Sequence, residues 1–308
     1  MNYQIIQKRI REKLAKLDTL RPMSSDLVKK LREQFSLEMN YNSNAIEGNT
    51  LTLRETMLVL KEGITIKNKP LKDHLEVKNQ AEAINYLYDI VQKKIPITEH
   101  LIRNIHSLVV QGIDGLEAGV YREYNVRISG STHNPPPAFE VSLKMKDLLT
   151  WFAIHEKKID TIDLATELKH RFVFIHPFGD GNGRTSRLIM NIVLMRAGIP
   201  IVVILKNDRK KYYQSLHRAD MGKIDDLKIF ISRAVERSLD IYSSVLIPSK
   251  KENTLLLVST IALHTPYSAE YISYLIRKGL ISGVKEGRNW KTSLEAIEKY
   301  RGNRQRRR

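Results

Sequence analysis

Apolar residues recur at intervals of three and four through most of the first 245 residues, the spacing that gathers them on one face of a helix. Glycine and proline interrupt this pattern only at intervals. The clearest segments predict helices at residues 5–17, 36–46, 53–60, 75–91, 161–175 and 184–197. We therefore expect a mainly α-helical fold.

Residues 121–137 break the helical pattern. Tyr124, Val126 and Ile128 alternate with polar residues at period two, a turn sequence follows at residues 129–131, and three prolines end the segment. This arrangement predicts a β-hairpin. Because a hairpin alone is not stable in water, we expect it to lie against the helical body.

The pattern changes again near the C-terminus. Residues 246–254 are polar and contain a proline, which predicts a linker. Beyond it the sequence predicts a short helix ending at Gly279, a pair of strands around residues 284–290, and a closing helix. We expect an N-terminal helical region (1–100), a helical core (101–245), the linker, and a small C-terminal domain with a basic tail (255–308).

The composition narrows the classes of partner and compartment. The net charge is +17, and residues 250–308 hold 13 Lys and Arg against 5 Asp and Glu. A C-terminus this basic indicates nucleic acid or another polyanion as a partner, or a tail that is simply solvated. The absence of cysteine excludes disulfides, a catalytic thiol and a thiolate metal site. Without a long apolar run or a signal sequence, a cytoplasmic protein that does not contact membranes is expected.

Candidate chemistry is concentrated in residues 176–187, which lie between two predicted helices. A loop with three glycines that leads into a helix presents backbone N–H groups and the positive end of the helix dipole, as anion sites do. Arg184 and Arg187 are three residues apart, so both can reach one polyphosphate. Asp180 suits Mg²⁺, the usual companion of ATP, and His176 can accept a proton near neutral pH.

The segment HPFGDGNGRTSR, residues 176–187, resembles the signature of the Fic family, H-x-F-x-[DE]-G-N-G-R-x-x-R, and matches it at every fixed position. The resemblance covers about residues 30–245 and implies a Fic-type helical bundle with a β-hairpin flap. It implies an adenylyltransferase that moves AMP from ATP to a Ser, Thr or Tyr hydroxyl of a target protein, with release of pyrophosphate. Transfer of UMP or GMP instead of AMP stays open. The identity of the target also stays open, and the protein itself is one candidate.

The resemblance also implies a role for each residue of the loop. His176 would deprotonate the target hydroxyl, and Asp180 would hold Mg²⁺. Arg184 would meet the β-phosphate of ATP, and Arg187 would meet the γ-phosphate. The two tyrosines Tyr212 and Tyr213 would form the adenine pocket, or else they pack a helix. The other implied nucleotide-binding residues are Gly181, Asn182 and Gly183.

The predicted hairpin acquires a role from the same resemblance. In Fic proteins this flap pairs with an extended segment of the target, which is a strand-addition mode of recognition. The residues that would frame the target are Val126, Ile128, Gly130, Ser131, Thr132 and His133.

An inhibitory motif is expected on a helix at about residues 36–48. Ser43-x-x-x-Glu47-Gly48 resembles the family's inhibitory sequence, [ST]-x-x-x-E-[GN]. Ser43 and Glu47 share a helix face, and Glu47 could pair bidentately with Arg187, the arginine meant for the γ-phosphate. The alternative is a surface glutamate that closes a helix. The resemblance favours autoinhibition, and in some relatives the corresponding glutamate also supports removal of AMP.

Residues 268–300 resemble a winged helix-turn-helix domain, with Lys285 and Arg288 on a basic wing and Trp290 in the core. Such a domain binds DNA through a helix and its wing, or it serves protein contacts and homodimer formation. The sequence identifies no base-reading residue, so both uses stay open. The alternative to an enzyme is a DNA-binding regulator whose Fic domain senses nucleotide or mediates dimerisation.

Overall fold

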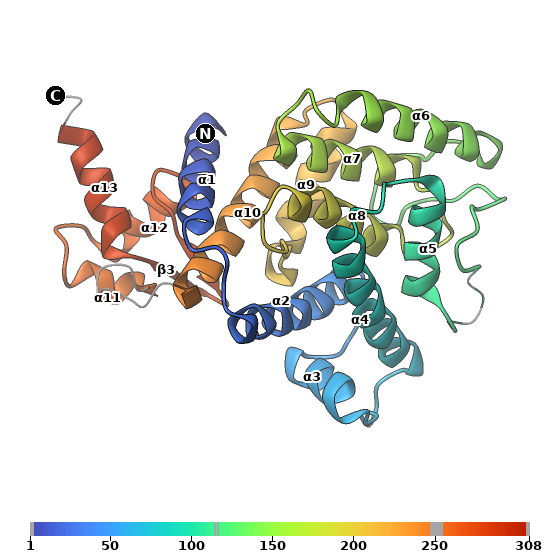
Figure 1. Ribbon diagram of the computed structural model, residues 1–308, viewed down its shortest axis with the longest axis horizontal. Coiled ribbons are helices and arrows are strands. Elements are labelled where there is room, and N and C mark those ends of the chain that lie inside the picture. Colours follow the sequence, from blue (N-terminus) through green and yellow to red (C-terminus); the bar gives the residue numbers. More distant parts are fainter. Residues whose placement is uncertain (1–2, 114, 116, 247–254, 306–308) are drawn as a thin grey trace. The chain divides into compact units, whose positions relative to one another are not determined.

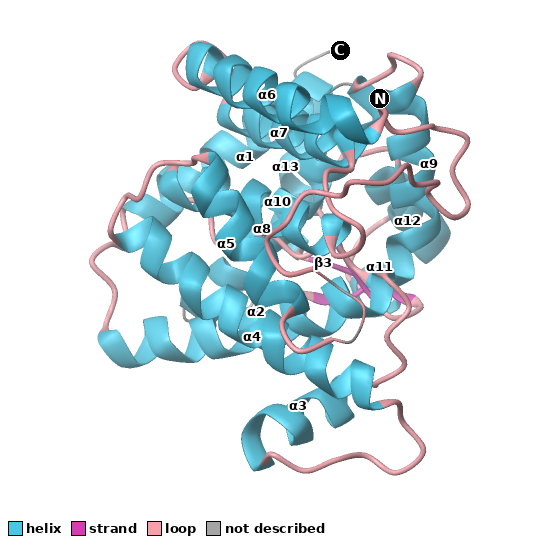
Figure 2. Ribbon diagram, turned by 90° about the vertical axis from the view of Figure 1, so that its right-hand side faces the viewer, coloured by secondary structure: helices cyan, strands magenta, loops and turns pink. Residues whose placement is uncertain are grey.

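The computed structural model in Figure 1 describes residues 3–113, 115, 117–246 and 255–305. These residues are mainly helical, with one three-stranded antiparallel sheet (Figure 2). Each of the six expected helices is present, although the one expected at residues 36–46 already begins at Ser25. Within the described ranges, no helix combines the length and the apolar character needed to span a membrane. The cytoplasmic location stays a prediction.

The chain forms two compact units, of which the larger is residues 29–231. It contains most of α2 (Ser25–Ile46) and the start of α10 (Asp225–Leu246). The elements between them are α3 (Leu53–Glu62), α4 (Leu71–Gln92), α5 (Glu99–Val110), η1 (Ala138–Glu140), α6 (Val141–His155), α7 (Thr161–Ile175), α8 (Asn182–Arg196), η2 (Lys206–Asp208) and α9 (Arg209–Asp220).

Helix α8 forms the centre of the larger unit. Helices α4, α5 and α7 pack against it (Figure 1), and 12 of its 15 residues are buried. Residues 188–194 are apolar except for Asn191, as expected of a helix covered on all sides. The first turns of α8 bury Arg184 and Arg187 instead. A buried charge is costly without a partner, so both arginines require anionic groups close by.

Local signals determine where the neighbouring helices begin and end. Thr52 and Glu55 form a reciprocal capping box at the start of α3, and the Asp160 carboxylate accepts the Ile162 N–H at the start of α7. Caps of this kind contribute about 1 kcal/mol each. Helix α7 ends at Ile175, and the φ of 52° and ψ of 60° at the following residue, His176, turn the chain into the loop before α8.

The segment at residues 121–137 is not the β-hairpin that its alternating pattern predicted. The turn is present, since the Ser131 N–H donates to the Ile128 carbonyl at 3.1 Å and Gly130 has a φ of 73°. However, no strand is found in this part of the described chain, and no backbone hydrogen bond joins the two arms. The flap is an extended loop around one turn.

Arg122 explains how this flap is held without a ladder. Its NH1 donates to the Tyr124 carbonyl at 3.0 Å, and its NH2 donates to the Pro136 carbonyl at 2.6 Å. The guanidinium therefore ties the two arms together at their base. The three prolines of the second arm have no N–H groups, so that arm cannot complete a ladder.

The smaller unit combines residues 1–28 with residues 232–308. The expected short helix, strand pair and closing helix are all confirmed, although the helix expected to end at Gly279 ends at Arg277. The sheet has the order β1-β3-β2, and a compact apolar cluster that includes Ile261, Ile272 and Ile297 packs with it. Its elements are α1 (Tyr3–Asp18), β1 (Leu256–Leu257), α11 (Val258–Ala262), α12 (Ala269–Arg277), β2 (Val284–Glu286), β3 (Asn289–Thr292) and α13 (Leu294–Gln305).

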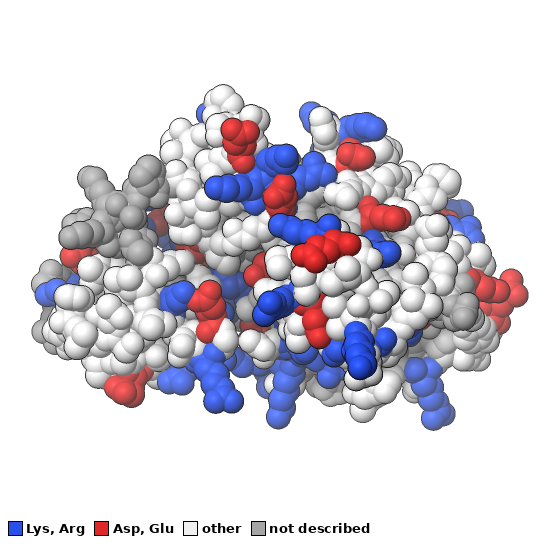
Figure 3. All heavy atoms as spheres, turned by 90° about the horizontal axis from the view of Figure 1, so that it is seen from below, with Lys and Arg blue, Asp and Glu red and all other residues white. Residues whose placement is uncertain are grey.

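The division into units differs from the boundaries expected from sequence, because α1 belongs with the C-terminal residues. Arg9 and Lys13 lie 2.6 and 2.9 Å from the Glu236 carboxylate, and Lys13 lies 2.6 Å from Asp240. Most of the expected linker, residues 247–254, and the end of the basic tail, residues 306–308, lie outside the described residues. Basic side chains are not confined to the C-terminus: on the face in Figure 3 they are spread among Asp and Glu side chains.

Candidate active site

The loop between α7 and α8 is held by its own side chains. The Asn182 amide donates to the Phe178 carbonyl at 2.8 Å and accepts the Phe178 N–H at 3.0 Å. Phe178 is fully buried and stacks on His106, with ring centroids 3.6 Å apart. The side chain of Asn182 therefore closes the loop, and the backbone N–H of this expected nucleotide-binding residue is left for a ligand.

His106 on α5 is a site residue that sequence reasoning missed. Its Nδ1 accepts the Gly119 N–H at 3.0 Å, so its Nε2 carries the proton and donates to the Asp180 carbonyl, also at 3.0 Å. Burial lowers its pKa to about 4, which keeps the ring neutral. The only signal in the sequence was a histidine on the apolar face of a helix. His106 fixes the backbone that presents the Asp180 carboxylate.

His176 is placed to accept a proton. Its Nδ1 lies 3.4 Å from the Val173 carbonyl, and because a carbonyl can only accept, Nδ1 carries the hydrogen and Nε2 keeps its lone pair. Burial, together with the nearby Arg122 charge, lowers the pKa of His176 to about 4. Arg122 also donates from Nε to the His176 carbonyl at 2.8 Å. The ring is therefore neutral at pH 7, as a general base must be.

Arg187 is surrounded by the end of α2. Its Nε donates to the Ser43 hydroxyl at 3.0 Å, and its NH2 lies 2.8 Å from both the Ser43 carbonyl and Glu47 Oε1. The pair with Glu47 thus uses one nitrogen and is not bidentate as expected, because Ser43 accepts from Nε and from the same NH2 group. Helix α2 ends at Ile46, and Glu47 follows in the closing turn. The NH1 of Arg187 makes no hydrogen bond with any described residue.

The Glu47 carboxylate lies directly against the N-terminus of α8. A Cβ atom added to Gly183 would be 2.0 Å from Glu47 Oε1, far inside van der Waals contact. Glu47 therefore occupies the position at the positive end of the helix dipole where an anion is favoured. The anion site expected from the sequence holds a carboxylate of the protein itself.

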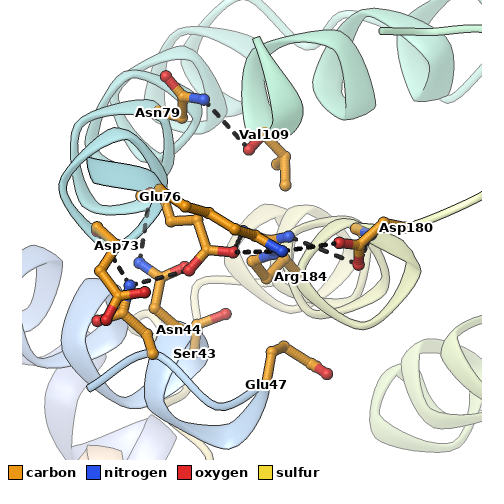
Figure 4. Close-up of polar contacts among 12 residues, drawn as sticks. Ser43, Asn44, Glu47, Asp73, Glu76, Asn79, Val109, Asp180 and Arg184 are labelled. Atoms are coloured by element: carbon orange, nitrogen blue, oxygen red, sulfur yellow. Dashed lines mark hydrogen bonds and ion pairs between the residues drawn. The ribbon is translucent and has the colours of Figure 1, made fainter. Parts of the chain in front are cut away.

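Arg184 lies between two carboxylates (Figure 4). Its NH1 is 3.1 Å from Glu76 Oε1, and its NH2 is 3.7 Å from Asp180 Oδ1. Glu76 comes from α4 and is buried, whereas the Asp180 side chain is 43% exposed. Lys72 Nζ lies 3.6 Å from Asp180 Oδ2. Glu76 and Lys72 were not expected from the sequence, since neither belongs to the motif.

The donor set suits a magnesium ion that arrives with a polyphosphate. Asp180 offers an accessible carboxylate at the mouth of the loop. Groups of three or more His, Asp or Glu side chains that could hold a metal are absent from the described part of the chain. Mg²⁺ commonly takes one or two carboxylates and completes its shell with phosphate oxygens and water. The residues therefore fit Mg²⁺ bound together with nucleotide.

The two tyrosines on α9 have different environments. Tyr212 is 1% exposed, and the Nζ of the buried Lys169 lies 4.6 Å from its ring centroid, so Tyr212 is a core residue as in the alternative reading. Tyr213 is 38% exposed, and its hydroxyl donates to Glu47 Oε2 at 3.5 Å. The Arg209 guanidinium lies 5.0 Å from the Tyr213 ring. Of this pair, Tyr213 is the one that a ligand can reach.

The second arm of the flap is attached to helices α7 and α9. The Thr132 hydroxyl lies 3.3 Å from His217 Nδ1, and His133 Nε2 lies 2.7 Å from the Phe174 carbonyl. Val126 and Ile128 on the first arm are half-buried, and their N–H groups make no backbone hydrogen bond in the described structure. The first arm thus presents backbone groups that an incoming strand could pair with.

Comparisons with known proteins identify the family of this chain. The model of the Fic/DOC family matches residues 96–194. A protein adenylyltransferase Fic from Nematostella vectensis is 36% identical over 250 residues, which are 80% of this chain and 58% of that protein. The chain spans about half the length of the curated relatives it matches.

Solved structures give the same result. A Fic domain-containing signalling protein from Bacteroides thetaiotaomicron has a TM-score of 0.72 at 30% identity, and the match covers 77% of this chain and 96% of that one. A fragment of Fic-1 from C. elegans has a TM-score of 0.71 at 30% identity, with 78% and 72% covered.

Proposed function

The chain belongs to the Fic/DOC family, and on that premise we propose that it transfers AMP from ATP to a hydroxyl group of a protein. The observation that carries the proposal is the neutral base next to an anion site. His176 has a free Nε2 lone pair, and the helix that follows its loop begins with Arg184 and Arg187. Curated relatives named protein adenylyltransferase Fic support the same activity.

The proposed reaction begins when Nε2 of His176 takes the proton of the target hydroxyl. The hydroxyl oxygen then forms a bond to the α-phosphorus of ATP, and the bond from that phosphorus to the bridging oxygen breaks, so that pyrophosphate leaves. Arg184 and Arg187 bind the β- and γ-phosphates and neutralise the charge that develops on the leaving group. Asp180 would hold Mg²⁺, which supplies further neutralisation of the phosphates when bound.

We further propose that the protein is autoinhibited. The γ-phosphate and Glu47 require the same partner, Arg187, and the same position at the start of α8. With Glu47 in place, ATP can bind only with its γ-phosphate displaced, which moves the α-phosphate away from His176. The hydrogen bond from the Tyr213 hydroxyl holds Glu47 there.

The target is proposed to bind along the flap by strand addition. Support comes from the first arm, where the N–H groups of Val126 and Ile128 make no backbone hydrogen bond in the described structure. The second arm is attached to α9 and α7 through Thr132 and His133 and would act as a fixed edge. The identity of the target stays open, and the protein itself is one candidate.

The experiment that tests the activity compares ATP labelled at the α-phosphate with ATP labelled at the γ-phosphate. It uses the Glu47→Gly variant, and it includes unlabelled UTP and GTP as competitors. Label on protein from the α-phosphate alone supports AMP transfer. Label from the γ-phosphate indicates phosphoryl transfer instead. The absence of label from both favours a protein that binds nucleotide without transferring it.

The rate of AMP transfer is expected to stay level from about pH 8 down to about pH 5. The pKa of His176 is lowered from 6.5 to about 4, so the ring loses its base function only below that range. Removal of Glu47, whose charge raises this pKa, moves the loss to still lower pH. The initial rate of the Glu47→Gly variant at ATP concentrations well below KM, which reports the pKa of the free enzyme, checks this when it is measured across pH. An acid limb centred near 6.5 contradicts it.

A second candidate function is DNA binding by the C-terminal domain as a winged helix. The hairpin of β2 and β3 favours it, because it carries Lys285 and, at its turn, the exposed Arg288. Trp290 packs at the edge of the apolar cluster and is only partly buried. The other proposed use of this domain is a homodimer contact.

Loss of the two wing charges is expected to weaken DNA binding by the full chain. The slope of log affinity against log salt concentration is expected to fall by the amount that corresponds to at most two phosphate contacts. The variant is Lys285→Ala with Arg288→Ala, measured by mobility shift at several salt concentrations. The matched control is Lys157→Ala with Lys158→Ala, which removes the same charge from exposed positions after α6. Equal effects of both pairs, or no shift at low salt, remove the DNA-binding proposal.

A further inference from the structure

Arg184 is held on one side by a carboxylate that the proposed reaction does not use. Its side chain is 1% exposed, so it depends on anionic partners within the protein. Glu76 Oε1 lies 3.1 Å from NH1, and Asp180 Oδ1 lies 3.7 Å from NH2. NH1 has only this ion pair with Glu76, and Nε makes no hydrogen bond with described residues, so Nε remains as a donor for a ligand.

The orientation of Glu76 is itself fixed. Its Oε2 accepts a hydrogen bond from the Asn49 amide at 2.9 Å, and the same amide nitrogen donates to the Asp73 carbonyl at 3.0 Å. The Asn49 oxygen accepts the Leu51 N–H at 3.0 Å, which prevents the amide from flipping. One carboxylate oxygen is thus anchored, and the other is directed at Arg184.

Glu76, Arg184 and Asp180 lie in this order from the buried interior to the exposed mouth of the site. Figure 4 shows the Glu76 carboxylate on one side of the Arg184 guanidinium and Asp180 on the other. The Glu76 side chain is 7% exposed, whereas that of Asp180 is 43% exposed. The buried carboxylate therefore holds one edge of the guanidinium, while the opposite edge faces the side from which a phosphate would enter.

We propose that Glu76 is the positioning residue for Arg184, and that the contribution of the β-phosphate to nucleotide binding depends on it. The proposal rests on the proposed function, in which Arg184 meets the β-phosphate. Glu76 does not contact the nucleotide. Glu76 holds the Arg184 guanidinium next to the loop before α8. Without the charge of Glu76, the Arg184 side chain turns toward Asp180.

The test measures ADP and AMP binding by calorimetry, in EDTA so that magnesium makes no contribution. The parent is the Glu47→Gly protein, and the variant adds Glu76→Gln, which keeps the shape and removes the charge. ADP affinity is expected to fall about tenfold, while AMP affinity stays unchanged, because AMP has no β-phosphate. Glu76→Asp, which restores the charge on a shorter side chain, is expected to recover part of the loss and serves if the glutamine variant does not fold.

The matched control is Asn79→Ala. Asn79 is three residues further along α4 and equally buried, and its amide donates to the Gln111 carbonyl at 2.7 Å, away from the loop. It is expected to lower the melting temperature without changing the ratio of ADP to AMP affinity. If Glu76→Gln also leaves that ratio unchanged, the inference is overturned. If the parent binds neither nucleotide, the proposed function fails first, and the inference fails with it.

Discussion

Replacement of His176 by asparagine is expected to lower AMP transfer by about 10²-fold to 10⁴-fold, the usual contribution of a general base. Asparagine removes the base but tolerates the left-handed backbone at this position, where φ is 52°. Alanine at the same position adds strain to the loss of the base. The measurement is incorporation of α-labelled AMP over time in the Glu47→Gly background.

The control for this variant is His100→Ala, which removes an exposed histidine of α5 that contacts Asn104. It is expected to leave the rate unchanged. ATP binding is also expected to survive in His176→Asn, because the phosphates are bound by Arg184 and Arg187. A rate within a few-fold of the parent would show that another group accepts the proton.

Replacement of Glu47 by glycine is expected to raise self-modification by about tenfold to a hundredfold, because a hydrogen bond to a charged group contributes about 1.5–3 kcal/mol. The change frees the NH2 of Arg187, which lies 2.8 Å from Glu47, and clears the space above Gly183. The γ-phosphate can then bind the NH2 group of Arg187 and occupy the space next to Gly183. The measurement is the initial rate of label incorporation from α-labelled ATP.

The matched control is Glu33→Gly, which makes the same substitution at an exposed position of α2, the helix that Glu47 follows. Glycine inside a helix costs about 1 kcal/mol relative to alanine, so this variant measures the effect of a looser α2 alone. This variant is expected to stay as inactive as the protein without a substitution. Equal activation by both variants would attribute the inhibition to helix stability and not to the Glu47 carboxylate.

The parts of the site that the sequence predicted are those encoded by adjacent residues. The loop before α8 and its two arginines could be located because glycine spacing and helical periodicity are local signals. The contact of Glu47 with Arg187 was also expected, although it spans 140 positions, because each partner belongs to a recognisable motif. Its single-nitrogen geometry was not expected, since the competing bonds from Ser43 depend on the packing of α2.

The parts that the sequence could not predict depend on contacts between distant segments without a motif. Glu76 and His106 are a charged and a polar residue on helices, and only the packing of α4 and α5 against α8 brings them to the loop. Arg122 explains why the predicted β-hairpin is absent from the flap. Its side chain joins the two arms in place of the backbone hydrogen bonds that the alternating pattern predicted. The burial of Tyr212 likewise follows from the tertiary packing of α9.

The measurement that tests the central claim most directly is the ratio of ATP to ADP affinity, with and without Glu47, in His176→Asn protein that cannot turn over. If Glu47 and the γ-phosphate compete for Arg187, the two nucleotides bind about equally while Glu47 is present. In the Glu47→Gly form, ATP is expected to bind about tenfold more tightly than ADP. An unchanged ratio would mean that Glu47 does not occupy the γ-phosphate position.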